Sequence, residues 1–155
     1  MTKELRTEIW QNRPFRSLEQ EAHLNIVRTA SFLSDGMDQI LRQHGITGPQ
    51  YNVLRILRGA EPNGLCRNDV RDRMLTRMPD MTRLLDRMEA AGLVSRCRDD
   101  DDRRLVTTRI TAGGLELLEK LDDLVDAEHR RRLGHMTEDQ LRTLVELAGL
   151  ARDAS

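Results

Sequence analysis

The fold is decided by the stretch Asp102-Arg103-Arg104-Leu105-Val106-Thr107-Thr108-Arg109-Ile110-Thr111-Ala112-Gly113-Gly114. Its charged start indicates a turn, its β-branched middle indicates a strand, and Thr111 is a typical helix N-cap. A helix-sized segment from Pro79 to Ala91 comes shortly before it and is closed by Gly92. This order of helix, charged hairpin and further helix predicts a mainly α-helical protein with a small β-hairpin wing, the winged helix-turn-helix fold.

The composition indicates a soluble and mostly helical protein. A chain of 155 residues fits one domain, or one domain with a dimerisation extension. Apolar residues make up 38% of the chain, which is enough for a core, but aromatic residues make up only 3%. The core must therefore be built from Leu, Val, Ile, Met and Ala, which suits helices better than a β-sandwich.

The charge distribution gives mixed evidence on nucleic-acid binding. The formal net charge of −1 argues weakly against it, because a DNA-binding domain is expected to be basic. The segment 64–110, however, holds eleven Arg and nine acidic residues, a local net charge of +2. Arginine suits bidentate contacts with phosphates and bases. A GC-rich genome explains the same preference for Arg equally well.

Several functional classes lack their sequence signals. Cys66 and Cys97 are far apart, and no set of His, Cys and carboxylate residues has the spacing of a zinc site. No nucleophile–base set or Gly-rich phosphate loop is present, so we expect neither an enzyme nor a cofactor. The N-terminus lacks an apolar run, and no window approaches the ~18 apolar residues of a membrane span. We therefore expect a cytoplasmic protein with reduced thiols and no membrane partner.

Capping signals divide the chain into a DNA-binding lobe between two sets of dimerisation helices. Capping boxes at Ser17, Thr47 and Thr137 predict helix starts, and Gly45 and Gly134 predict helix ends. The predicted parts are an N-terminal arm over 1–16, dimerisation helices over 17–44 and 111–155, and the winged lobe over 45–110. Within the lobe we expect a short helix over 67–74 and strands over 92–98 and 105–110.

The terminal helices are amphipathic and lack an obvious cover within their own chain. A stripe over 17–44 runs from Leu18 to Leu41, and another in the helix after Thr111 includes Leu121. A symmetric homodimer is the commonest way to bury such stripes. We expect Leu121 to lie at that interface.

The segment Pro79 to Ala91 is the candidate recognition helix. Met81, Leu84, Leu85 and Met88 follow the spacing of a buried face, so other residues must face outward. The N-terminal turn of such a helix reaches deepest into the major groove, where Arg83 is able to contact guanine or a phosphate. Asp80 is expected to cap the helix. The candidate contacts are Arg77 and Met78 at the entry and Thr82, Arg83 and Arg87 on the outer face. The alternative is a solvated face with pairs near Asp86.

The wing supplies a second set of candidates. Arg104 near its tip is suited to the narrow, electronegative minor groove. Asp102 is placed to accept hydrogen bonds from the Arg104 guanidinium and to fix its direction. Arg98 and Arg103 are further candidate contacts. The alternative is a polar turn, because the four acidic residues 99–102 repel phosphates unless arginines pair with them.

The pattern Asp102, Arg104, Ile110, Thr111 and Gly114 resembles the signature of the MarR family of bacterial transcription regulators, with Ile110 where Leu is usual. Residues 82–94 resemble its recognition helix and 47–54 its second helix, so the resemblance covers about 17–152. It implies a homodimer that binds a pseudo-palindromic operator, with Arg104 in the minor groove and Asp102 supporting it. It also implies repression relieved by a small phenolic or other anionic effector, or by an oxidant.

The effector site and one competing function stay open. Residues with aromatic or polar groups suited to a ligand are Trp10, His23, Arg28 and Tyr51, although ordinary surface or core is the favoured interpretation of each. No Cys lies near the start of the first long helix, where the peroxide-sensing branch of the family has one. The alternative function is a helical dimer that acts as a protein-interaction module without DNA binding.

Overall fold

The computed structural model describes residues 4–98, 102 and 104–153, which form two compact units, residues 1–37 and 38–155. The first unit contains α1 (Leu5–Glu8) and most of α2 (Leu18–Gln43). The N-terminal arm expected over 1–16 contains the short helix α1. Leu5 is buried there, and the Arg28 Nε lies 3.9 Å from a Glu8 carboxylate oxygen.

The start of α2 shows half of the expected capping box. The Ser17 hydroxyl accepts a hydrogen bond from the Gln20 backbone N–H at 3.1 Å, as a cap should. The Gln20 side chain, however, accepts from the backbone N–H of Arg16 at 2.7 Å. In a complete capping box the Gln20 side chain would accept from the backbone N–H of Ser17, but here its partner is the preceding residue.

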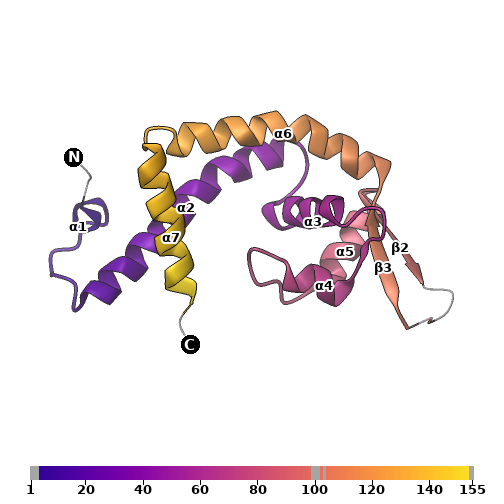
Figure 1. Ribbon diagram of the computed structural model, residues 1–155, viewed down its shortest axis with the longest axis horizontal. Helices are drawn as coiled ribbons and strands as arrows, with labels where there is room; N and C mark the ends of the chain where they lie inside the picture. The colour runs from indigo at the N-terminus through magenta and orange to yellow at the C-terminus, as the bar shows by residue number, and fades with distance from the viewer. Residues whose placement is uncertain (1–3, 99–101, 103, 154–155) are drawn as a thin grey trace. The chain divides into compact units, whose positions relative to one another are not determined.

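The second unit contains the winged lobe and the C-terminal helices (Figure 1). A three-stranded antiparallel sheet has the order β1-β3-β2, with Leu65 opposite Thr108 and Val94 opposite Ile110. The expected hairpin of β2 and β3 is confirmed, and β1 is an addition. The elements are α3 (Gly48–Gly59), β1 (Leu65–Cys66), α4 (Arg67–Asp72), α5 (Met81–Ala90), β2 (Val94–Arg98), β3 (Val106–Ile110), α6 (Ala112–Leu133) and α7 (Glu138–Arg152).

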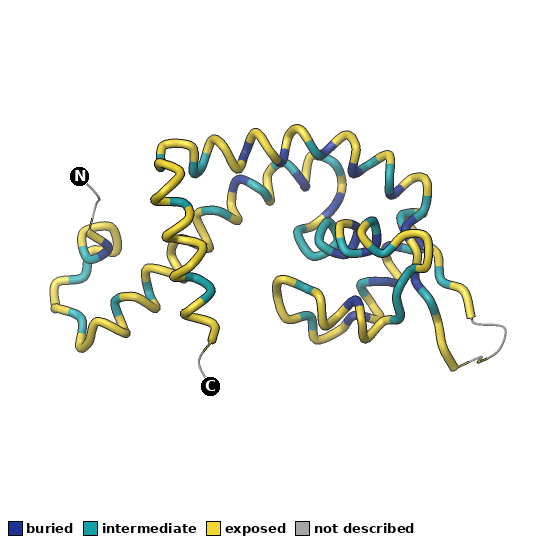
Figure 2. Tube along the Cα trace, in the orientation of Figure 1, coloured by how far each residue is buried: buried dark blue, intermediate teal, exposed yellow. Residues whose placement is uncertain are grey.

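The core of this unit is aliphatic, as the composition predicts. α3 packs against α6 and β3, and α5 packs against β2. Figure 2 shows buried positions on α3, on α5 and along α6, whereas α7 is largely exposed. The fully or almost fully buried side chains include Val53, Leu54, Leu57, Val70, Leu85, Met88, Val94, Leu118 and Leu121. Leu121 was expected at a dimer interface, but it is 0% exposed in a single chain and is a core residue.

A tight junction joins the wing to α6. Thr111 caps α6 by accepting from the Gly114 N–H at 3.1 Å, and its hydroxyl donates to the Gly92 carbonyl at 2.6 Å. Gly114 is buried where α6 passes close to the chain between α5 and β2. A Cβ at Gly114 would lie 2.5 Å from the Leu93 carbonyl oxygen and 2.7 Å from the Ile110 side chain. Only glycine fits this close approach.

The Gly114→Ala variant should therefore be less stable by about 1–3 kcal/mol, because the backbone of Leu93 must move to admit the methyl group. Gly59→Ala is the matched control, since no atom lies within 4 Å of its added Cβ. It should be neutral or more stable by up to ~1 kcal/mol. Chemical denaturation measures both, and equal stability of the two variants would contradict the close approach.

A buried carboxylate lies near the end of α6. Glu128 is 7% exposed and accepts hydrogen bonds from Arg131 at 2.7 Å and from Arg132 at 2.8 Å. The hydrogen bonds from these two guanidinium groups lower the pKa of Glu128 from its ordinary 4.5 to about 2. The ionised form is thus the one that the fold stabilises.

This shift predicts a pH-dependent contribution to stability. A carboxylate with a lowered folded pKa stabilises fully above about pH 4.5, and this contribution is lost as the pH falls towards about 2. Glu128→Gln should therefore lower the melting temperature at pH 7, and the difference from the unchanged protein should shrink between pH 4.5 and 2. A difference that does not vary with pH over this range would contradict the assignment.

Candidate nucleic-acid interface

Helix α5 presents the predicted inner and outer faces. Met81, Leu85 and Met88 are buried, Leu84 is half-buried, and Thr82, Arg83 and Arg87 are exposed. The helix does not begin at Pro79, as the sequence suggested. The Asp80 carboxylate accepts the Arg83 N–H at 3.0 Å, so Asp80 is the N-cap and Met81 the first helical residue. The Asp80 carboxylate satisfies one of the N–H groups that a helix leaves without a partner in its first turn.

Arg96 of β2 binds both carboxylates on one side of α5. Its Nη2 lies 2.6 Å from Asp86 Oδ1 and 2.9 Å from Glu89 Oε1. The Arg96 backbone N–H also donates to Glu89 Oε2 at 2.9 Å. The Arg96 guanidinium lowers the pKa of the Glu89 carboxyl through these hydrogen bonds. The network ties the recognition helix to the first strand of the wing.

This network determines which charged side chains of α5 have an ion-pair partner. Asp86 pairs with Arg96, and no ion pair joins it to Arg83 or Arg87, so the expected alternative of ion pairs along the helix face is not observed in the described residues. Sequence reasoning missed Arg96. The alternation of side chains along a strand could have indicated it. Arg96 lies two residues after the buried Val94, so both side chains lie on the same face of the sheet.

Between residues 77 and 104, leaving aside residues 99–101 and 103, five exposed arginines have no side-chain partner. They lie on the turn before α5, on its outer face, at the end of β2 and just before β3. Charges that the fold does not neutralise are available to phosphates and to guanine edges. These residues are Arg77, Arg83, Arg87, Arg98 and Arg104.

The described part of the wing fixes the backbone of Arg104. Asp102 Oδ1 accepts the Arg104 backbone N–H at 3.0 Å, and the Asp102 carbonyl accepts the Leu105 N–H at 2.9 Å. The expected bond from Asp102 to the Arg104 guanidinium is replaced by this backbone bond. Asp102 therefore shapes the turn and leaves the Arg104 guanidinium free. Arg103 and the acidic residues 99–101 lie outside the described residues.

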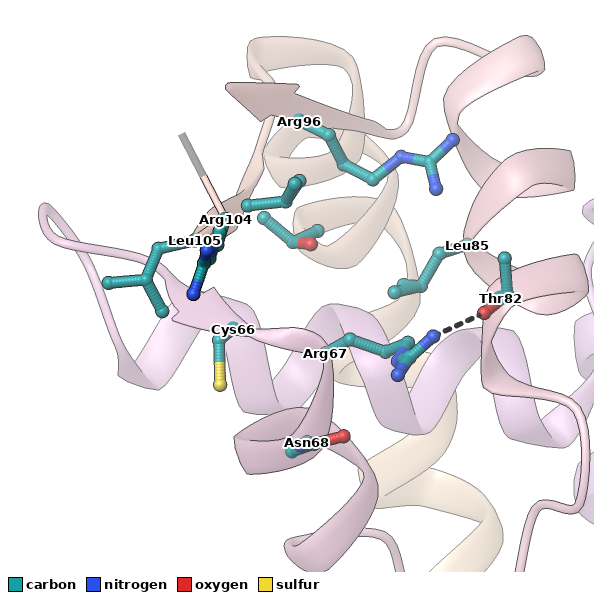
Figure 3. Close-up of a pocket in the computed structure, with 10 residues that line it drawn as sticks. Cys66, Arg67, Asn68, Thr82, Leu85, Arg96, Arg104 and Leu105 are labelled. Atoms are coloured by element: carbon teal, nitrogen blue, oxygen red, sulfur yellow. Dashed lines mark hydrogen bonds between the residues drawn. The ribbon is translucent and has the colours of Figure 1, made fainter. Parts of the chain in front are cut away.

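A hollow of about 380 Å³ lies between α4, α5 and the sheet (Figure 3). Arg67 extends from the start of α4, and its Nη1 donates to the Thr82 hydroxyl at 2.9 Å. Arg96 and Arg104 also line this hollow, together with Leu85. Sequence reasoning missed Arg67 because its partner is fifteen residues away in the chain. The bond makes the Thr82 oxygen an acceptor and leaves its hydrogen free to donate to another group.

The entry to α5 forms a second hollow of about 410 Å³, lined by Arg77, the half-buried Met78, Arg71, Thr76 and Pro79. Its two arginines and Thr76 offer donors for a phosphate. The structure thus brings Arg77 and Met78 together at the entry, as the sequence predicted.

The four effector candidates lie in separate surroundings. In the first unit, Trp10 is exposed and lines a hollow with Arg6 and Gln11, and His23 is exposed on α2. Arg28 lines a different hollow of about 330 Å³ with Phe32 and Asp35. In the second unit, the Tyr51 hydroxyl accepts a bond from Arg55 Nη1 at 3.1 Å.

The described residues offer no metal-ion cluster and no membrane-spanning helix. They contain no group of three His, Cys, Asp or Glu side chains placed to hold a metal ion. None of the helices in this part of the chain is both long enough and apolar enough to cross a bilayer. Cys66 is half-buried and Cys97 is exposed, and both are free thiols.

Comparison with known proteins identifies the family. Residues 44–105 match a family model described as MarR family. The HTH-type transcriptional regulator TtmR of Methylorubrum extorquens (strain PA1) is 31% identical over 138 residues, which cover 89% of this chain and 69% of the relative. A crystal structure of a MarR transcription factor from Planctomyces limnophilus is 39% identical, with a TM-score of 0.68, and the match covers 88% of this chain and 99% of that one.

A structure of S. aureus MepR in complex with DNA is 25% identical, with a TM-score of 0.73. This match covers 84% of the present chain and 96% of MepR. The relatives are described as transcription regulators, which favours the DNA-binding hypothesis over the interaction-module alternative. The winged lobe, its unpaired arginines and these matches agree, and the chain belongs to the MarR family of transcriptional regulators.

Proposed function

We propose that a homodimer of this chain binds a pseudo-palindromic operator in double-stranded DNA and represses transcription by occupying it. The observation that carries the proposal is the set of unpaired arginines on α5, its entry turn and the wing. Two copies related by a two-fold axis would present two such sets to two half-sites. The MepR–DNA structure supports the same use of this fold.

Each side chain has a distinct role in this proposal. Arg83 and Thr82, in the first turns of α5, read base edges or nearby phosphates in the major groove, and Arg87 contacts the backbone. Arg104 enters the minor groove, with its backbone fixed by Asp102. The remaining contacts are Arg77 and Met78 at the entry and Arg98 and Arg103 on the wing.

Exposed apolar side chains support the dimer and the proposed division of the chain. On α7, Val145 is 73%, Leu147 57% and Leu150 68% exposed, and no residue of this helix is buried. In α2, Leu18, Ile26 and Phe32 are also exposed. Burial of such residues against a partner is favourable by about 25 cal/mol per Å². We therefore assign 17–44 and 111–155 to dimerisation and 45–110 to DNA binding.

Release by a small anionic or phenolic effector completes the proposal. Trp10, His23, Arg28 and Tyr51 remain the candidate contacts for such a molecule. The protein is then a cytoplasmic regulator and not an enzyme, because DNA is its target and the effector is bound without reaction.

DNA binding is tested with purified protein and the DNA flanking its own gene, at two salt concentrations. Arg83→Ala and Arg104→Ala should each weaken specific binding by about 1–3 kcal/mol while the dimer stays intact. Wild-type affinity should fall steeply as salt rises, because phosphate contacts release counterions. Arg142→Ala is the matched control, since Arg142 pairs with Glu138 on the exposed surface of α7.

Equal affinity of the Arg83, Arg104 and Arg142 variants would contradict the assigned interface. If the intact dimer does not bind that DNA, a genome-wide selection of bound fragments decides the matter. Selection of a shared palindromic sequence would support the proposal, and selection of none would favour the interaction module. A reporter gene under the operator should be repressed by the protein, and activation would contradict the repressor role.

Dimerisation is tested by Leu147→Glu, which places a carboxylate in the proposed interface. Because an unpaired buried charge is costly, the variant should raise the dimer dissociation constant by about tenfold or more. Leu75→Glu is the matched control, since Leu75 is 89% exposed in the turn after α4. Sedimentation measures both. A Leu147→Glu protein as dimeric as the control would place the interface elsewhere.

A further inference from the structure

A bidentate ion pair joins α3 of the winged lobe to α6. Arg58 Nη1 donates to Asp122 Oδ2 at 2.8 Å, and Arg58 Nη2 donates to Asp122 Oδ1 at 3.0 Å. The Arg58 guanidinium holds the pKa of the Asp122 carboxyl below its ordinary value. The Arg58 and Asp122 side chains are 30% and 42% exposed, so the pair lies at the edge of the packed surface.

The pair differs in kind from the apolar contacts beside it. Val53, Leu54 and Leu57 of α3 are buried, as are Leu118 and Leu121 of α6. Such contacts are non-directional and allow packed helices to shear by small amounts. A guanidinium and a carboxylate joined by two parallel hydrogen bonds have one preferred geometry. The ion pair therefore opposes a small rotation that the apolar contacts tolerate.

The position of Asp122 gives such a rotation a large effect. Asp122 lies in the middle of the 22-residue α6, whose first residue, Ala112, directly follows the wing junction. Ten residues separate the two positions, or about 15 Å of helix at 1.5 Å per residue. A rotation of about 10° at the pair would move that end by about 3 Å, close to the rise of one base pair.

We propose that the Arg58–Asp122 ion pair sets the distance between the two DNA-reading helices of the dimer and so determines which half-site spacing the protein selects. This inference rests on the proposed function. Arg58 and Asp122 are positioning residues: neither is assigned a contact with DNA, and both act through the orientation of α6 relative to α3. Because Thr111 joins the first turn of α6 to the wing and to the end of α5, these elements move with α6. Loss of the pair should relax the preference for spacing more than it lowers affinity for the best spacing.

The test measures affinity for operators in which the two half-sites are unchanged and the spacer is shortened or lengthened by one base pair. Wild-type protein should lose on the order of tenfold in affinity for each altered spacer. Asp122→Asn should reduce this discrimination to about threefold or less. Arg58→Lys keeps the charge but not the bidentate geometry, and should behave in the same way. The double exchange of Arg58→Asp with Asp122→Arg should restore discrimination.

Controls separate the inference from general damage to the fold. Glu8→Gln changes a carboxylate of α1, which lies outside the winged lobe and the assigned dimerisation helices, and should leave spacing discrimination at the wild-type level. Dimer mass and melting temperature are recorded for every variant to confirm that it folds. If Asp122→Asn does not fold, Arg58→Lys alone tests the inference. Wild-type discrimination retained in a folded Asp122→Asn or Arg58→Lys protein would overturn the inference. Failure of the wild-type dimer to bind any spacing would instead overturn the proposed function.

Discussion

The junction at Thr111 is the constraint on which the DNA-binding lobe depends. One residue separates the end of β3 from the start of α6, and its hydroxyl and backbone bind to both sides of the junction. Thr111 accepts from Gly114 in α6, donates to Gly92 after α5, and its N–H donates to the Leu93 carbonyl. The wing, the end of the recognition helix and the long helix are thereby held together. A change in the direction of α6 must carry the wing with it.

Electrostatic pairing then determines what this rigid lobe presents to a ligand. With the exception of Asp69, each described acidic residue of the segment 64–110 accepts a bond: Asp80 caps α5, Asp102 holds the wing backbone, and Arg96 binds two others. Asp72 pairs with Arg71. The exposed arginines of α5 and the wing have no carboxylate partner among the described residues, so no ion pair neutralises their charges.

Local signals in the sequence predicted the elements whose stability is local. The boxes at Thr47 and Thr137 and the caps at Asp80 and Thr111 form as expected, because each needs only residues three positions away. Strand β1 could not be predicted, since two residues show no period and the strand exists only through pairing with β3. The Arg67–Thr82 and Arg58–Asp122 bonds are also tertiary, and their partners lie fifteen and sixty-four residues apart.

Net charge was also a poor guide to function in this chain, because it ignores the contacts that form only on folding. The run Arg130-Arg131-Arg132 looks like a basic patch in the sequence, yet the buried Glu128 engages two of its three guanidinium groups. The segment 64–110 has a net charge of only +2, yet six of its described arginines are exposed and their guanidinium groups have no partner among the described residues. A phosphate responds to the charges that remain after folding, and a count of residues includes those that the fold has already neutralised. The pairing of an arginine, and not its presence in the sequence, therefore determines whether its charge is available to a phosphate.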